Sequence, residues 1–145
     1  MFMRANTIAS HSSCQANRGR VWHLTKEYLR VMFQRALVFF SGFSHFFYGV
    51  IALCHPHFVA EFARYGFDDY RGLIGVTQSL LGLGLLMGFY NKNLKIYAAL
   101  GLAIMMAGAV GTRIHIGDTF IQSTPAIIYL IINLFIFSTS IMSKK

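Results

Sequence analysis

Long apolar runs separated by short polar segments make up most of the chain after residue 35. Four nearly uncharged runs of 17 to 19 residues cover positions 36–54, 72–90, 96–112 and 126–142. As helices they would rise about 25 to 28 Å, close to the thickness of a bilayer's hydrocarbon core. None shows the alternation of a membrane strand. The pattern predicts an all-α integral membrane protein, a bundle of four transmembrane helices.

The loop between the first two runs, residues 55–71, carries a helical pattern of its own. Phe58, Phe62 and Tyr65 recur at i, i+4 and i+7, which places them on one helix face. Pro56 suits a first helical turn and Gly66 suits a C-terminal cap. We therefore expect a short amphipathic helix in the first outer loop, along the outer surface or dipping into the mouth of the bundle.

Charge distribution indicates the topology. The chain is 55% hydrophobic and only 12% charged, against about 25% charged residues in an average soluble domain. Ten of the 13 Lys and Arg lie in segments that share one membrane side if there are four spans, and only Arg64, Arg71 and Arg113 lie on the other. This positive-inside pattern explains the net charge of +8 without a nucleic-acid partner. It predicts a multi-pass protein of the bacterial inner membrane with both termini cytoplasmic.

Residues 1–31 differ from the rest because they are polar and basic, with no run of seven apolar residues. We interpret them as a disordered tail, or as residues upstream of a true start at Met32. An Arg- and Ser-rich, acid-poor mitochondrial transit sequence is the alternative. The transmembrane domain then covers residues 32–145.

Glycines flank two polar positions at equal spacing. Gly42 and Gly49 lie at minus three and plus four from His45, and Gly75 and Gly82 frame Gln78 in the same way. Such residues let helices approach closely. The third run adds a ladder of small residues and one more pair of glycines, which flanks an apolar residue. These small residues indicate either ordinary close packing of helices or a groove shared by three helices. The ladder is Ala99, Ala103, Ala107 and Gly111.

Three polar side chains fall at mid-membrane depth: His45, Gln78 and Asn133. Polar groups there are costly and tend to face the bundle interior, so they form a candidate intramembrane site. Interhelical hydrogen bonding is the simpler interpretation of Asn133. For His45 and Gln78, hydrogen bonding and function are both open. His45 could relay a proton or hold a quinone carbonyl, whereas Gln78 cannot relay a proton by titrating.

A second candidate site gathers the charged residues of the outer loops. It is either a solvated surface with weak ion pairs or a polar lid over the bundle. Its members are Glu61, Arg64, Asp68, Asp69, Arg71, Arg113, His115 and Asp118.

Signals for familiar enzyme classes are missing from the sequence: it has no phosphate-binding glycine loop, HExxH, GxSxG or kinase set. His55 and His57 form an HxH pair without a third ligand, so no metal site is predicted. No catalytic residue is assigned.

Several ordered motifs carry a family resemblance. They are G-F-S-H at 42–45, H-P-H-F-V-A-E-F-A-R-Y-G-F at 55–67, R-G-L-I-G-V-T-Q-S-L-L-G-L-G-L-L at 71–86, A-L-G-L-A-I-M-M-A-G-A-V at 99–110 and R-I-H-I-G-D at 113–118. In order and spacing the chain resembles the DoxX-like family of small four-helix membrane proteins from about residue 39 to residue 137. The resemblance implies a four-helix bundle with tightly packed second and third helices. The family commonly carries Glu at the position of Gln78, so this chain departs from any mechanism that needs an intramembrane carboxylate.

Some members of that family are the small subunit of a thiosulfate:quinone oxidoreductase, and others serve membrane redox complexes or act as assembly factors. We therefore expect an accessory subunit or assembly factor of a membrane complex, not catalytic alone, with a membrane protein partner or a homo-oligomer. One alternative is a quinone-linked oxidoreductase subunit with His45 and Gln78 lining the quinone site. Another is a small transporter acting as a homo-oligomer. No cofactor is predicted, and quinone is the one to consider.

Overall fold

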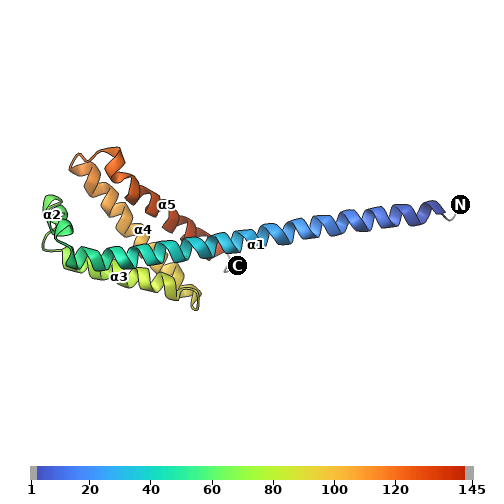
Figure 1. Ribbon diagram of the computed structural model, residues 1–145, viewed down its shortest axis with the longest axis horizontal. Coiled ribbons are helices and arrows are strands. Elements are labelled where there is room, and N and C mark those ends of the chain that lie inside the picture. The colour runs from blue at the N-terminus through green and yellow to red at the C-terminus, as the bar shows by residue number, and fades with distance from the viewer. Residues whose placement is uncertain (1–2, 143–145) are drawn as a thin grey trace. The chain divides into compact units, whose positions relative to one another are not determined.

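The computed structural model describes residues 3–142, with side chains from residue 21 onward, and its regular secondary structure over that range is helical. The described residues contain no strand (Figure 1). The expected all-α class is therefore confirmed. The helices are α1 (Met3–Cys54), α2 (Pro56–Arg64), α3 (Arg71–Met87), α4 (Lys92–His115) and α5 (Phe120–Met142).

The chain divides into two compact units, residues 1–35 and 36–145. The first holds the beginning of α1, and its side chains from Val21 to Phe33 are exposed. The second holds the rest of α1 and the other helices. Helix α1 passes through the expected boundary near residue 31 without a break. A separate, disordered domain at residues 1–31 stays a prediction.

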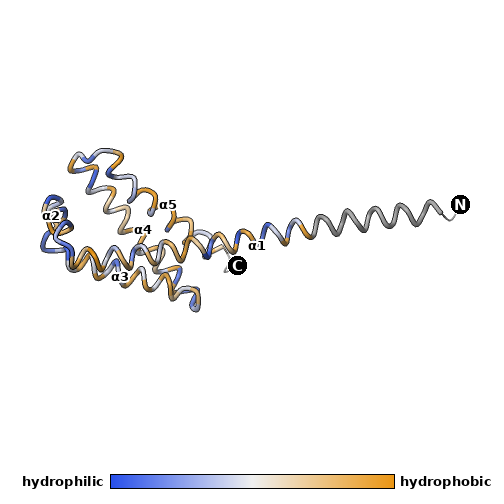
Figure 2. The backbone as a smooth tube through the Cα atoms, in the orientation of Figure 1, coloured by the Kyte–Doolittle hydropathy of each residue, from blue (hydrophilic) through white to orange (hydrophobic). Residues whose placement is uncertain are grey.

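Three helices are long and apolar enough to cross a membrane: Val21–Cys54 within α1, α4 and α5. Figure 2 shows hydrophobic residues along their lengths and hydrophilic residues at α2. Many large apolar side chains also face outward, such as Phe43, Leu80 and Ile131 at 53 to 63% exposure. Since water would penalise such a surface and lipid would not, the chain is a membrane protein.

Local capping explains where the shorter connections begin and end. The His55 side chain accepts a hydrogen bond from the His57 amide, with Pro56 in the first turn of α2. Gly66 follows the end of α2 with a φ of 74°, a left-handed conformation that suits glycine. Asn91 caps α4 by accepting from the amides of Asn93 and Leu94.

The last helix begins earlier than expected. The fourth apolar run was expected to start after Pro125, but α5 starts at Phe120 and contains Pro125. Gln122 caps the start of this helix, since its Oε1 accepts from the Thr119 amide over 2.8 Å and from the Thr119 hydroxyl over 2.9 Å. This cap nucleates a turn that is too polar to count as part of a transmembrane run.

Helices α1 and α3 cross at glycines. A Cβ on Gly82 would lie 2.5 Å from the Phe46 nitrogen and 2.8 Å from the Gly42 carbonyl oxygen. A Cβ on Gly75 would lie 3.1 Å from the Gly49 carbonyl oxygen. Backbone therefore meets backbone over two turns of each helix, an approach that side chains would prevent.

Helix α4 packs on both α3 and α5. Ala99 and Ala103 of the small-residue ladder are buried, whereas Ala107 and Gly111 are exposed and Gly111 has no neighbour within 4 Å of a built Cβ. The ladder thus packs inside the chain only along its first half. The buried core beside it consists of Val38, Leu85, Ala98, Ala99, Leu102 and Ile136.

We predict that Gly82→Ala destabilises the bundle, because the added methyl meets the backbone of α1. An overpacked site costs about 1 to 3 kcal/mol. The control is Gly108→Ala on α4, where a Cβ meets nothing within 4 Å and the better helix propensity of Ala should be neutral or stabilising. Thermal unfolding in mild detergent measures both. Equal melting temperatures for the two variants would contradict the close crossing.

Candidate functional site

His45 lies at the centre of a buried polar network that joins three helices. Its side chain is 2% exposed, and its two ring nitrogens face different neighbours. Nδ1 lies 3.1 Å from the Gln78 amide on α3, and Nε2 lies 3.0 Å from the Asn133 amide nitrogen on α5. The three polar residues expected at mid-membrane depth therefore lie together.

Asn133 is held by further contacts that fix its amide. Its nitrogen donates to the Tyr129 carbonyl over 2.9 Å, and its oxygen accepts from the Ser41 hydroxyl over 2.8 Å. The atom of Asn133 that faces the Tyr129 carbonyl must be its amide nitrogen, because an amide oxygen has no proton to donate to a carbonyl oxygen. It follows that Asn133 also donates to His45 Nε2.

This donation determines the proton on His45. A neutral imidazole with Nε2 as acceptor carries its proton on Nδ1. The atom of Gln78 that lies 3.1 Å from Nδ1 is its amide nitrogen, Nε2, and an N–H at Nδ1 needs an acceptor there. A half turn of the Gln78 amide exchanges its nitrogen and oxygen and supplies that acceptor, Oε1. With the amide turned in this way, both ring nitrogens of His45 are hydrogen-bonded.

Two members of this network were not singled out from the sequence. Ser41 lies four residues before His45, and Tyr129 lies four residues before Asn133. The Tyr129 ring packs on the His45 ring with centroids 4.8 Å apart. Helical spacing from the known polar residues could have found both, because i and i−4 share a helix face.

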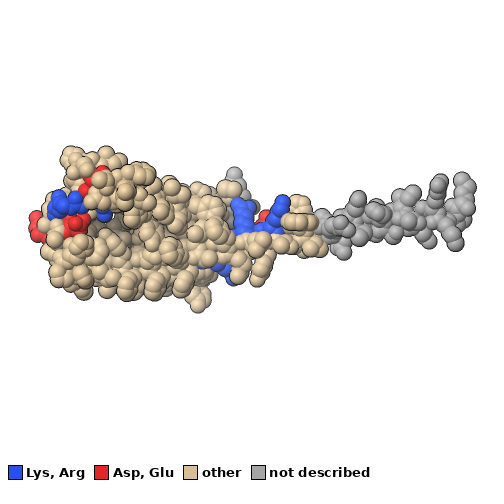
Figure 3. All heavy atoms as spheres, turned by 45° about the horizontal axis from the view of Figure 1, so that its top comes forward, with Lys and Arg blue, Asp and Glu red and all other residues tan. Residues whose placement is uncertain are grey.

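A second polar cluster joins α2 to the connection between α4 and α5. Arg64 donates to both carboxylate oxygens of Asp118, over 2.7 and 3.3 Å, and Arg113 donates to the same carboxylate over 3.0 Å. Glu61 accepts from Arg64 and from the Tyr65 hydroxyl. Figure 3 shows these charges gathered over the end of the bundle that holds α2. We call Glu61, Arg64, Tyr65, Arg113 and Asp118 the outer latch.

The remaining residues expected in the outer cluster lie elsewhere. Arg71 donates to the carbonyls of Ala52 and Leu53 over 2.9 Å, and so caps the C-terminal end of α1. Its Nε is buried and has no hydrogen-bond partner among the described residues. Asp68, Asp69 and His115 are exposed, and the hydrogen bonds and ion pairs described for the latch do not include their side chains. Sequence proximity alone had grouped them with it.

The latch shifts the ionisation of its carboxylates. Hydrogen bonds from Arg64, together with the charges of Arg64 and Arg113, hold the pKa of Asp118 below its usual 3.8. Hydrogen bonds from Tyr65 and Arg64 likewise lower the pKa of Glu61. Burial and the hydrogen bond to Glu61 raise the pKa of Tyr65. The latch therefore persists as an ion-paired unit at neutral pH.

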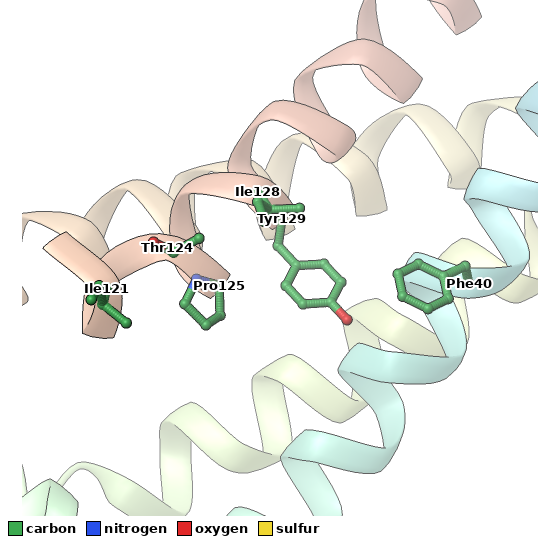
Figure 4. A pocket seen from close by; sticks show the side chains of 6 residues that line it. All are labelled: Phe40, Ile121, Thr124, Pro125, Ile128 and Tyr129. Atoms are coloured by element: carbon green, nitrogen blue, oxygen red, sulfur yellow. The ribbon is translucent and has the colours of Figure 1, made fainter.

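The structure also shows a groove between α1 and α5. Its volume is about 410 Å³, and its lining is mostly apolar (Figure 4). The lining residues are Phe40, Ile121, Thr124, Pro125, Ile128 and Tyr129. His45 and Gln78 are not among them.

Metal-binding groups are not apparent at these sites. No group of three or more His, Cys, Asp or Glu side chains is arranged to hold a metal within the described part of the chain. His55 and His57 serve the start of α2 instead.

Comparison with known proteins identifies one family. The family model of the DoxX-like family matches residues 33–136. No curated protein and no solved structure matches the chain.

We predict that Asn133→Ala loosens the buried network, because the Ser41 hydroxyl and His45 Nε2 both lose their partner. Unpaired buried polar groups cost about 1 to 3 kcal/mol. The control is Ser138→Ala on the same helix, where the exposed hydroxyl binds only the Leu134 carbonyl. Unfolding in mixed detergent micelles compares the two variants, and similar losses of free energy would contradict the network.

The outer latch should make stability depend on pH. Because the fold lowers the pKa of Asp118, its contribution is fully present above pH 3.8 and is lost as the pH falls through the lower folded pKa. Asp118→Asn should lower the melting temperature at pH 7 and flatten its fall in acid. Asp69→Asn, on an exposed loop residue, serves as control. A parallel acid profile for Asp118→Asn and the parent would refute this assignment.

Proposed function

The chain belongs to the DoxX-like family, and we propose that it serves a membrane complex as an accessory subunit or assembly factor without catalytic activity of its own. A redox-linked complex is the class to test first. The membrane is proposed to be the bacterial inner membrane.

The closed network around His45 carries this proposal. His45, Gln78 and Asn133 are 2, 4 and 0% exposed, and their hydrogen-bonding atoms are directed at one another. A substrate or proton path would need one of these groups to face a cavity, as functional polar residues in membranes commonly do. Here the side chains of His45, Gln78 and Asn133 hydrogen-bond to one another and hold three helices together, which is a structural role.

The open half of the small-residue ladder supports a partner helix. Ala107, Gly108 and Gly111 are exposed on α4, and a Cβ at either glycine meets nothing within 4 Å. Their buried counterparts, Ala99 and Ala103, show that the same ladder accepts close helix packing. We propose that a helix of the partner packs on the open half.

The two alternatives stay predictions. A quinone site lined by His45 and Gln78 would require this buried pair to separate and leave each other's hydrogen bonds. A transport path through the same residues would require the same opening. The geometry favours the accessory role over both.

We also propose that α3 is a fourth membrane span and that both termini are cytoplasmic. Helix α3 is 17 residues long and rises roughly 26 Å. From residue 36 onward, α1, α3, α4 and α5 run in alternating directions (Figure 1). The positive-inside pattern then assigns the α3–α4 turn to the cytoplasm.

Reporter fusions test this topology. Phosphatase and fluorescent reporters fused after Lys95 should report the cytoplasm, and the same reporters fused after Asp118 should report the opposite side. Reporters that agree at both positions would exclude α4 as a span between them.

Affinity purification tests the accessory role. The tagged chain in mild detergent should carry a stoichiometric membrane partner, and Gly111→Leu should reduce its recovery at least several-fold by blocking the open ladder. Val76→Leu adds bulk to an exposed position of α3 and should leave recovery unchanged. A stable monomer without a partner would refute the proposal.

A further inference from the structure

The groove between α1 and α5 has the chemistry of a site for a membrane-soluble ligand. Its 410 Å³ lies within the range of small-molecule sites, and no charged side chain lines it. Ile121, Pro125 and Ile128 present one face of α5, opposite Phe40 of α1 (Figure 4). Apolar contacts dominate the lining.

One polar group breaks this apolar surface. The Tyr129 ring stacks on Phe40 with centroids 6.0 Å apart and packs on His45 at 4.8 Å. Its hydroxyl points away from α5 towards α1 (Figure 4) and makes no hydrogen bond to any residue that the structure describes. The other hydroxyl of the lining, on Thr124, already donates to the Phe120 carbonyl. Tyr129 therefore offers the groove one free donor and acceptor.

The depth of Tyr129 restricts what can meet that hydroxyl. Its ring packs on His45, the central residue of the apolar run 36–54, with centroids 4.8 Å apart, and therefore lies away from the lipid headgroups. A hydroxyl left without a partner in hydrocarbon is costly. Its partner must be soluble in the bilayer interior, uncharged, and able to share a hydrogen bond.

We propose that the groove binds one uncharged amphiphile that carries a single hydroxyl or carbonyl on an apolar chain. The oxygen hydrogen-bonds to the Tyr129 hydroxyl, and the chain lies along Ile121, Pro125 and Ile128. Because Tyr129 also contacts His45 and offers its carbonyl to Asn133, the ligand stabilises the association of α1 with α5. This site is separate from the partner-binding ladder on α4.

Photolabelling in nanodiscs tests the site. The probe is octadecanol with a diazirine at mid-chain, and the matched probe is the same diazirine on octadecane. Irradiation followed by peptide mass spectrometry should show saturable labelling of residues 121–129 by the alcohol, displaced by unlabelled octadecanol. The alkane should label the same residues more weakly and without saturation.

Two variants separate the hydroxyl from the groove. Tyr129→Phe removes only the oxygen and should weaken the alcohol roughly 5-fold, the value of one neutral hydrogen bond. Ile128→Trp fills the groove and should abolish saturable labelling, whereas Ile131→Trp, at an exposed position of α5 outside the groove, should not. Equal, non-saturable labelling by both probes, or unchanged affinity in Tyr129→Phe, would overturn the proposal and leave the groove as ordinary lipid-facing surface.

Discussion

The close approach of α1 and α3 is the constraint on which the rest of the bundle depends. Gly42, Gly49, Gly75 and Gly82 remove the side chains that would hold the two backbones apart. Only at that separation can the short Gln78 amide reach His45 Nδ1 at 3.1 Å. The glycines and the polar pair therefore act together. Close packing brings His45 and Gln78 within reach of each other, and their hydrogen bond fixes the register of the two helices.

The His45 network connects the packed pair of α1 and α3 to α5. Asn133 donates to His45 Nε2 and is itself oriented by Ser41 and by the Tyr129 carbonyl. In a bilayer, where apolar surface gives little net attraction between helices, such contacts distinguish one arrangement from another. The outer latch performs a comparable task at the end of the bundle that holds α2, since Asp118 accepts from both Arg64 and Arg113 and so joins α2 to the α4–α5 connection. Most of the polar residues in these two clusters therefore hold helices together, whereas the open ladder of α4 and the groove beside Tyr129 have no such role among the described residues.

The sequence by itself determined the all-helical class, the apolar helices and the family. Those properties follow from local information: the length of apolar runs, the glycine and proline punctuation and the order of the motifs. The caps at Pro56 and Gly66 lie where local turn chemistry placed them. The spacing of glycines around His45 and Gln78 also indicated two matching helix faces.

Only the tertiary structure decided which faces meet and which groups become partners. Arg71 was expected in the outer cluster but caps α1, because the end of that helix leaves carbonyls within its reach. Helix α5 starts at Phe120 because the Thr119–Gln122 cap extends it beyond the apolar run. Asn133 meets His45, and half of the α4 ladder stays open, because helix rotation is set by all neighbours at once. Hydropathy along a chain reports depth in the membrane, but it carries no information about which side of a helix another helix will cover.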